Sequence, residues 1–311
     1  MTESTAAAHL RGEPAARRVV VVGAGIAGLA AAHELARDGR VEVVVLEGSP
    51  RTGGKLLRGE VAGVCTDLGA ESVLARRPEG LALIDEIGLV ADVVAPQTLR
   101  AGVWSRSAVR PLPAGHVMGV PTGLRALAAS GVVSPGAVLR AALDRALPAS
   151  HVSGDTSVGT FVGARLGRAV VERLVEPLLG GVYAGRADEL SLRATLPQVA
   201  AVAGERSLLH ALRSRPTPVA GGPVFAGLPG GIGRIAETLT ASVISRGVGV
   251  RLDCAVRSLE RAGLGWRLVF GSAAAPHTLE ADAVVLATPA APTSRLLASS
   301  APAAAAELAA I

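Results

Sequence analysis

The segment VVVVGAGIAG, residues 19–28, decides the fold of the first part of this 311-residue chain. Its four valines predict a short buried strand, since parallel sheets are covered on both faces and favour β-branched residues. The G-x-G-x-x-G that follows leads into Leu29–Arg37, an alanine-rich stretch with good helix propensity. A second strand is predicted over Val41–Leu46 and ends on Glu47. This order of elements predicts a Rossmann-type nucleotide fold.

Each part of the glycine loop has a physical task in such a fold. Gly23 permits the tight turn, Gly25 lets the backbone approach a pyrophosphate, and Gly28 lets the helix pack closely on the strand. The phosphates then meet the free N–H groups at the positive end of the helix. Glu47, 19 residues after Gly28, can accept hydrogen bonds from ribose hydroxyls and would repel a 2′-phosphate, which disfavours NADP. The alternative is a glycine turn without a ligand, and the loop alone does not choose between FAD and NAD.

The next segment resembles a flavin motif. Residues 47–55, EGSPRTGGK, resemble the E-x-x-x-R-x-G-G-[KR] stretch of the flavin amine oxidase superfamily. The resemblance implies FAD, with Gly53 and Gly54 wrapping the flavin side of the cofactor. Arg51 and Lys55, the only lysine of the chain, would offset pyrophosphate charge or fix the loop. A solvated loop is the alternative for these two cations.

Later segments carry the same resemblance. Residues 67–72, DLGAES, resemble the next FAD-contacting segment, although Glu71 can equally be a surface charge. Residues 228–233, LPGGIG, resemble the segment by which these enzymes return to the nucleotide domain, and they open a predicted helix that runs to Ser245. Strands are predicted over 248–252, 255–260 and 283–286, with Ala287 and Thr288 as candidate contacts. The predicted cofactor-binding residues are Gly23, Ala24, Gly25, Ile26, Ala27, Gly28, Glu47, Gly48, Arg51, Gly53, Gly54, Lys55, Gly69, Ala70, Glu71, Ser72 and Val256, the last as an aliphatic neighbour of the adenine.

The middle of the chain changes character. From about residue 78 to 215 helical stretches alternate with Gly and Pro, which predicts a mostly helical insertion. Several stretches carry arginine beside Ala, Leu and Val, a pattern that suits an anionic membrane surface. The solvated outer face of an ordinary helix is the alternative. The arginines concerned are Arg125, Arg140, Arg145, Arg165, Arg168 and Arg173.

One segment of this region points to a subfamily. Residues 180–185, GGVYAG, followed by Glu189-Leu190-Ser191, resemble the G-[VI]-[YF]-[AS]-G-x-x-x-x-L-S segment of protoporphyrinogen and coproporphyrinogen oxidases. The resemblance implies FAD-dependent oxidation of protoporphyrinogen IX or coproporphyrinogen III by dioxygen, in haem biosynthesis. The structural alternative is a packed turn with Tyr183 as a core aromatic. Functional alternatives are another oxidase or desaturase of the superfamily, or a non-catalytic FAD-binding fragment.

Composition sets further limits. The net charge is +5, but the arginines are scattered and no nucleic-acid motif accompanies them, so a carboxylate-bearing substrate or a peripheral membrane contact fits better than DNA or RNA. Two distant cysteines argue against a disulfide framework and a zinc site. No secretory or membrane-spanning pattern is found, so we expect a cytoplasmic protein, with the inner face of the cell membrane as an open alternative. The catalytic residues and the oligomeric state are left open, and Arg76 and Arg77 are candidate partners for substrate propionates.

The expected architecture is α/β, a Rossmann-like FAD-binding domain with a mostly helical insertion and part of a substrate domain. We expect a disordered tail over 1–16, the FAD-binding domain over 17–77 and 223–290, the insertion over 78–222, and the start of a substrate domain over 291–311. Full members of the resembling family are longer. The sequence therefore resembles the N-terminal part of an oxidase, and we expect an incomplete isoalloxazine pocket.

Overall fold

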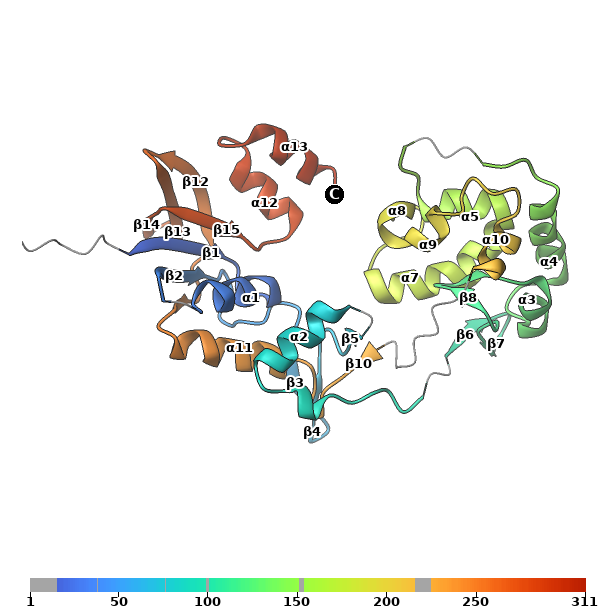
Figure 1. Ribbon diagram of the computed structural model, residues 1–311, viewed down its shortest axis with the longest axis horizontal. Coiled ribbons are helices and arrows are strands. Elements are labelled where there is room, and N and C mark those ends of the chain that lie inside the picture. Colours follow the sequence, from blue (N-terminus) through green and yellow to red (C-terminus); the bar gives the residue numbers. More distant parts are fainter. Residues whose placement is uncertain (1–15, 38, 76, 99–100, 151–153, 216–224) are drawn as a thin grey trace, which may run out of the picture. The chain divides into compact units, whose positions relative to one another are not determined.

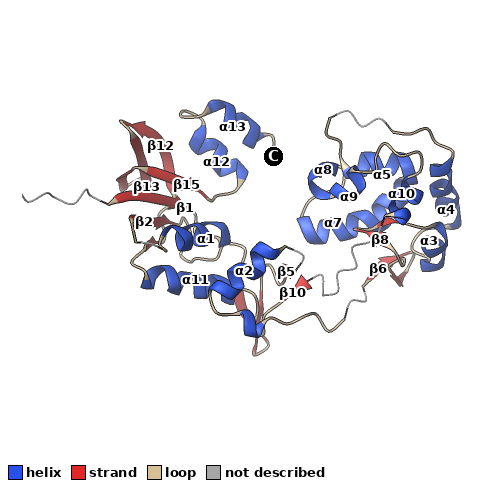
Figure 2. Ribbon diagram, viewed as in Figure 1, coloured by secondary structure: helices blue, strands red, loops and turns tan. Residues whose placement is uncertain are grey.

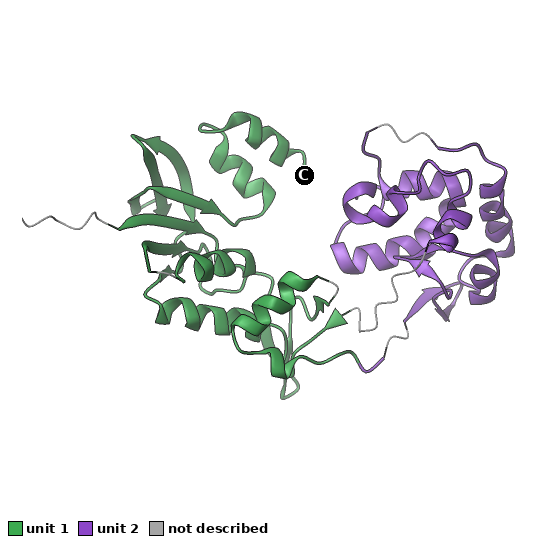
Figure 3. Ribbon diagram, viewed as in Figure 1, with its two compact units in different colours: residues 1–96, 220–311 green, residues 97–219 purple. Residues whose placement is uncertain are grey.

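The computed structural model describes residues 16–37, 39–75, 77–98, 101–150, 154–215 and 225–311 (Figure 1). The expected tail therefore lies almost wholly outside the described residues. The chain forms two compact units, one from residues 1–96 and 220–311 and the other from 97–219 (Figure 3). The second unit begins at residue 97, whereas the sequence led us to expect an insertion from residue 78. The first unit is thus built from two separate parts of the chain.

A four-stranded parallel sheet lies at the centre of the first unit, in the order β11-β2-β1-β15. The strands are β1 (Arg17–Val22), β2 (Val41–Leu46), β11 (Gly249–Arg251) and β15 (Ala283–Leu286). Helix α1 (Ile26–Leu35) follows β1 and begins three residues earlier than predicted. The reason is that Gly25 is itself the N-cap, with an extended backbone at φ −69° and ψ 179°. The glycine loop therefore passes into the helix without an intervening residue.

The two faces of this sheet are buried against different layers. On one face Val21, Val43 and Val45 pack with α1 and with α11 (Arg234–Ser245). On the other, Val20, Val22 and Val44 pack with a three-stranded antiparallel sheet (Figure 2). Successive strand residues point to opposite faces, so the valine run is buried on both sides. That sheet consists of β12 (Val256–Ala262), β13 (Gly265–Gly271) and β14 (Pro276–Ala281).

Smaller elements complete the first unit. A hairpin, β3 (Arg58–Val61) with β4 (Val64–Asp67), follows the second glycine segment. Leu296 of α12 (Ala290–Leu297) joins the core between the two sheets, so the expected start of a substrate domain packs on the nucleotide fold. The remaining strands and α-helices are β5 (Val73–Leu74), paired with β10 (Phe225–Ala226), α2 (Pro78–Glu86) and α13 (Pro302–Ala309).

The second unit is mainly helical around its own apolar core. Two short hairpins, β6 (Gly102–Ser105) with β7 (Ala108–Pro111) and β8 (His116–Val117) with β9 (Val120–Pro121), precede the helices. Within the described residues, no helix of either unit has the length and apolarity needed to cross a bilayer. The α-helices are α3 (Leu124–Ser130), α4 (Pro135–Ala142), α5 (Val158–Leu166), α6 (Arg168–Val170), α7 (Glu176–Tyr183), α8 (Leu192–Thr195), α9 (Pro197–Ala200) and α10 (Leu208–Ser214), and a π-helical segment, Val171–Val175, joins α6 to α7.

The arginines of this unit do not form one free basic face. Arg165 is buried and ion-paired with Asp144, its Nη2 lying 2.6 Å from the carboxylate. Arg168 makes two bonds of 2.6 Å to Asp188. The sequence did not reveal these pairs because each carboxylate lies about 20 residues away, outside the helix that carries the arginine. Buried Arg165 is therefore not available to an anionic membrane surface, whereas Arg168, whose side chain is exposed, would have to exchange its pairing with Asp188 for such a contact.

Tyr183 is also placed differently from the core aromatic of the structural alternative. It ends α7, and the following Ala184 has a left-handed backbone with φ 52°. Tyr183 is 46% exposed, and its hydroxyl donates to the Thr195 carbonyl at 3.3 Å. The turn between helices is present, but the aromatic lies at its surface.

Candidate nucleotide-binding site

The predicted cofactor residues meet where the parallel strands end. Val22 lies opposite Leu46 and Leu286, so the three strands end in register. Backbone bonds continue past the ladder, from Gly23 to the Leu46 carbonyl at 2.8 Å and from Glu47 to the Arg251 carbonyl at 2.9 Å. The carboxyl edge of a parallel sheet is where α/β proteins bind nucleotides.

The first glycine loop leaves no room for side chains at two of its three glycines. A Cβ on Gly28 would lie 1.8 Å from the Gly23 carbonyl oxygen, and one on Gly23, at φ +101°, would lie 2.9 Å from the Ala287 carbonyl oxygen. A Cβ on Gly25 would meet nothing within 4 Å. Gly23 and Gly28 are therefore needed by the protein itself, whereas the space at Gly25 is open to a ligand.

The start of α1 is open as well. Gly25 offers no capping side chain, and Ile26 and Ala27 are exposed. In the described part of the chain, no side chain accepts a hydrogen bond from the N–H groups of Ile26, Ala27 or Gly28. The parallel bridge between Gly25 and Gly53 turns the Gly53 carbonyl toward the Ile26 N–H, so Ala27 and Gly28 carry the open N–H groups. Uncapped N–H groups at the positive end of a helix form an anion site. This geometry fits a pyrophosphate.

Glu47 holds the loop and retains capacity for a ligand. Its carboxylate accepts from the Ala24 N–H at 2.6 Å and from the Ser49 N–H at 2.9 Å. An ionised carboxylate has about four acceptor positions, so about two remain for ribose hydroxyls. The sequence prediction gave Glu47 a ligand role only, and the structure adds a role in shaping the loop.

The second glycine segment packs directly on the first. Gly53 donates to the Ala24 carbonyl at 2.8 Å, and a Cβ on Gly54 would lie 3.1 Å from the Gly25 Cα. Arg51 donates to the carbonyls of Thr52 at 3.1 Å and Gly54 at 2.8 Å, so its guanidinium fixes the loop. Lys55 is exposed, and within the described residues its ammonium has no hydrogen-bonded or ion-paired partner. Lys55 remains the predicted cation for the pyrophosphate.

The remaining predicted residues lie next to these loops. Ala70 donates to the Lys55 carbonyl at 3.0 Å, and a Cβ on Gly69 would lie 2.1 Å from the same oxygen. Glu71 and Ser72 are exposed. Gly48 lies against Ala255, which brings half-buried Val256 to the Glu47 side of the site. The contacts of these residues with a cofactor stay predictions.

Some residues near the site have roles that the sequence did not show. Asp67, which the sequence grouped with the flavin segment, accepts hydrogen bonds from the start of α11. Ala287 packs against Gly23 and Gly28, so its contact is with the glycine turn. Arg77 is exposed, and Arg76 lies outside the described residues. The sequence offered one indication of this contact: the glycines of residues 228–233 leave room for another group to approach the backbone closely, and Asp67 is that group.

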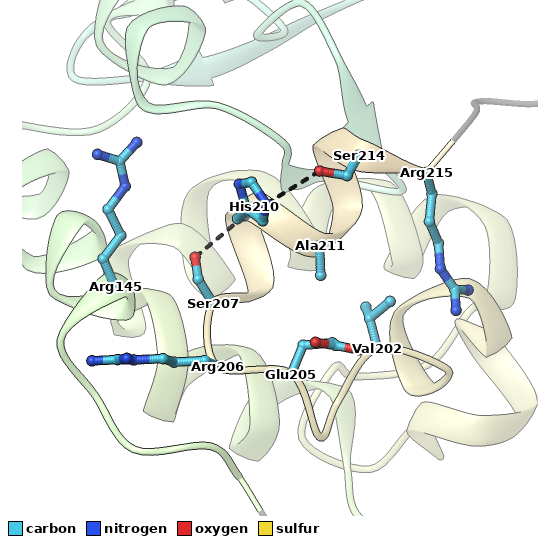
Figure 4. Close-up of a pocket in the computed structure, with 9 residues that line it drawn as sticks. All are labelled: Arg145, Val202, Glu205, Arg206, Ser207, His210, Ala211, Ser214 and Arg215. Atoms are coloured by element: carbon cyan, nitrogen blue, oxygen red, sulfur yellow. Dashed lines mark hydrogen bonds between the residues drawn. The ribbon is translucent and has the colours of Figure 1, made fainter.

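A groove of about 440 Å³ lies in the second unit, around α10 (Figure 4). Figure 4 shows His210 between Ser207, which accepts from the His210 backbone N–H at 3.2 Å, and Ser214, 3.4 Å from its ring. The charged residues of the groove are all exposed, and it contains none of the predicted cofactor residues. The lining residues are Arg145, Val202, Glu205, Arg206, Ser207, His210, Ala211, Ser214 and Arg215.

Comparison with known proteins gives a consistent result. Residues 26–310 match the family model described as flavin containing amine oxidoreductase. The chain is 38% identical to coproporphyrinogen III oxidase of Mycobacterium leprae over 92% of its own length and 62% of that relative. It is 36% identical to the protein of that name from Propionibacterium freudenreichii, covering 94% of the chain and 61% of the relative. The chain thus spans about three fifths of the length of these relatives.

Solved structures agree. A provisionally named protoporphyrinogen oxidase from an Exiguobacterium species has a TM-score of 0.74 at 32% identity, over 91% of this chain and 62% of that one. Cyclohexylamine oxidase from Brevibacterium oxydans has a TM-score of 0.62 at 18% identity, over 94% of this chain and 63% of that one. The second similarity concerns the fold alone.

Proposed function

Because the chain belongs to the family of flavin-containing amine oxidoreductases, we propose that it carries the FAD-binding part of an enzyme that oxidises a porphyrinogen. The observation that carries the proposal is the 38% identity to a coproporphyrinogen III oxidase over 92% of the chain. The sequence identity to cyclohexylamine oxidase is only 18%. Several coproporphyrinogen III oxidases show 36–38% identity, against 31% for a protoporphyrinogen oxidase of Arabidopsis thaliana, so we favour coproporphyrinogen III as the substrate.

FAD is the cofactor, and the site fits it. The open N–H groups of α1 would hold the pyrophosphate, Glu47 the adenosine ribose, and Lys55 would balance phosphate charge. Gly69–Ser72 would border the flavin side. Bound FAD would supply the electron-accepting chemistry for a reduced tetrapyrrole, with dioxygen as the final acceptor. The residues of this chain would bind and orient the cofactor.

Purification of the 311-residue chain tests the proposal directly. We expect a visible flavin spectrum after reconstitution and release of FAD on denaturation. Oxidation of coproporphyrinogen III and of protoporphyrinogen IX, followed by porphyrin fluorescence, then tests the substrate, with cyclohexylamine as the control for an amine oxidase. A folded protein that takes up NAD and not FAD would contradict the proposal at the cofactor step. Bound FAD with amine oxidation and no porphyrin would contradict it at the substrate step.

Peripheral contact with an anionic membrane stays a prediction. Arg125 and Arg145 are exposed, whereas Arg165 and Arg168 are engaged in ion pairs. Sedimentation with phosphatidylglycerol vesicles at low and high salt would measure the contact, since surface charge attraction is screened by salt.

A further inference from the structure

A second glycine-rich loop in the first unit leads into a helix. The segment Leu228–Gly233 precedes α11, and Gly230 and Gly231 have left-handed φ values of +77° and +101°. Successive backbone N–H groups in such a turn form a concave anion site, and the helix dipole adds to it. By its glycines and its position before a helix, this loop resembles a phosphate site, as the loop before α1 does.

The anion position of this second loop is occupied by the protein itself. Asp67, the last residue of β4, accepts from the Ile232 N–H at 2.7 Å and from the Gly233 N–H at 2.9 Å. A Cβ on Gly231 would lie 2.6 Å from the Asp67 carboxylate. The glycine thus makes room for a carboxylate of the same chain.

Arg58 strengthens the same contact from the neighbouring strand. Arg58 lies opposite Asp67 in the register of the β3–β4 hairpin. Its side chain donates to the Gly230 carbonyl at 2.7 Å and forms an ion pair with Glu237 of α11 at 2.6 Å. A Cβ on Gly233 would lie 2.4 Å from the Arg58 side chain. The hairpin therefore binds the start of α11 through one anion and one cation.

The predicted cofactor residues are continuous with this hairpin. Leu68 donates to the Leu57 carbonyl at 2.7 Å, which extends the ladder toward Lys55 and Gly69. On its other side, α11 supports the second glycine segment, because Thr240 bonds Thr52 at 2.9 Å. Both segments predicted to contact the flavin side thus depend on the position of the hairpin relative to α11.

We propose that Asp67 is a positioning residue that replaces a phosphate at the start of α11. Its carboxylate closes the Leu228–Gly233 loop to anions and fixes the β3–β4 hairpin, so that Lys55 and Gly69–Ser72 are positioned for FAD. The inference about FAD rests on the proposed function. The closure of the loop does not.

The test compares Asp67→Asn and Asp67→Ala with Glu60→Gln. Glu60 is an exposed carboxylate of the same hairpin, so its variant removes the same charge without touching α11. Titration of the 311-residue apoprotein with FAD, followed by the visible spectrum, should give a Kd about tenfold or more higher for Asp67→Asn than for wild type. Glu60→Gln should bind as wild type does. Equal affinity in wild type, Asp67→Asn and Glu60→Gln would overturn the positioning role.

A second measurement does not require FAD. In Asp67→Ala the two N–H groups lose their acceptor. The start of α1 can bind phosphate in both proteins, so inorganic phosphate should raise the melting temperature of this variant by more than it raises that of wild type, at equal ionic strength in chloride. No difference between the proteins would overturn the replacement of a phosphate. If wild type itself does not bind FAD, the cofactor proposal fails, while the phosphate measurement still decides the closure of the loop.

Hydrogen exchange in the wild-type protein covers the case of variants that do not fold. FAD should slow exchange over residues 228–237 as well as over residues 55–72, because the hairpin joins the two segments. Protection of residues 55–72 without residues 228–237 would contradict the proposal.

Discussion

The two glycine-rich loops of the first unit occupy similar positions in the fold, but only one of them is left open to a ligand. Each leads into a helix, α1 or α11, and the two helices pack against the same face of the parallel sheet. In the described residues the N–H groups of Ala27 and Gly28 at the start of α1 have no side-chain acceptor, because Glu47 binds earlier in that loop, at Ala24, whereas the N–H groups of Ile232 and Gly233 before α11 are taken by Asp67. A glycine-rich turn before a helix is therefore a site only if the protein supplies no anion to the N–H groups at the start of that helix.

The glycines differ in the same way. Gly25 borders open space, while Gly231 and Gly233 border side chains of the β3–β4 hairpin. In the first loop one glycine is kept for a ligand, and in the second loop two are kept for the protein. Substitution by alanine can separate these two uses.

Gly28→Ala should have the largest effect. Its methyl group would lie 1.8 Å from the Gly23 carbonyl oxygen, so α1 must move away from the sheet. We expect a loss of more than about 3 kcal/mol in the free energy of unfolding, together with loss of FAD binding. Urea unfolding followed by circular dichroism measures the first effect. Gly136→Ala, in α4 with nothing within 4 Å, is the matched control and should be neutral or stabilising.

Gly231→Ala should be the next most destabilising, by about 1–3 kcal/mol. The substitution combines a strained φ of +101° with a contact of 2.6 Å to Asp67. Gly63→Ala provides the strain alone, because Gly63 has a φ of +81° and nothing within 4 Å. If both variants lose the same free energy in urea unfolding, the contact with Asp67 contributes nothing and the comparison between the loops fails.

Gly25→Ala should weaken cofactor binding with little effect on folding. The new methyl group meets no protein atom within 4 Å, and Gly25 has an ordinary φ of −69°. It would occupy the space through which the pyrophosphate approaches, so we expect the Kd for FAD to rise about tenfold or more. Equilibrium titration and a melting curve separate the two effects. A lower melting temperature with unchanged affinity would be the contrary result.

The smallest effect concerns His33, a buried residue of α1 that faces α11. Its Nδ1 lies 3.3 Å from the hydroxyl of Ser242 in α11. Burial lowers the pKa of His33 below its usual 6.5, with Arg246 and Arg37 acting in the same direction and Glu86 and Glu34 opposing them. The unfolded chain therefore binds the proton more readily, and stability is retained above pH 6.5 and lost as the pH falls below it.

The measurement for His33 is the melting temperature as a function of pH in wild type and His33→Gln. The variant should lose less stability on acidification than wild type does. The matched control is the same substitution at His116, a histidine of β8 in the second unit whose pKa is also lowered by burial. An identical pH dependence in wild type and His33→Gln would show that His33 does not link the two helices in this way.

The sequence was sufficient for the parts of the site that are local. The valine run, the first glycine loop and Glu47 lie within 30 residues, and their spacing reflects the geometry of one strand–helix–strand unit. The family resemblance rested on segments of the same kind, and the family is confirmed.

What the sequence did not provide are contacts between distant segments. Asp67 meets Ile232, 165 positions later, and no local pattern indicates that a carboxylate in a flavin-like segment caps another helix. Arg165 was interpreted as one of several surface cations, yet it is buried against Asp144. In both cases the partner is set by the tertiary fold, which periodicity and propensity do not encode.

The division of the first unit into two parts of the chain has a consequence for synthesis on the ribosome. Strand β1 pairs with β15, so the central sheet can be completed only after Ala283, the partner of Val19, has been synthesised. The second unit, residues 97–219, is continuous and emerges in between. Domains generally fold as units while the chain grows, and pairing across long separations is slow. The glycine loop that is translated first is therefore among the last parts to reach its working shape, because the strand that flanks β1 on one side is translated more than 250 residues later.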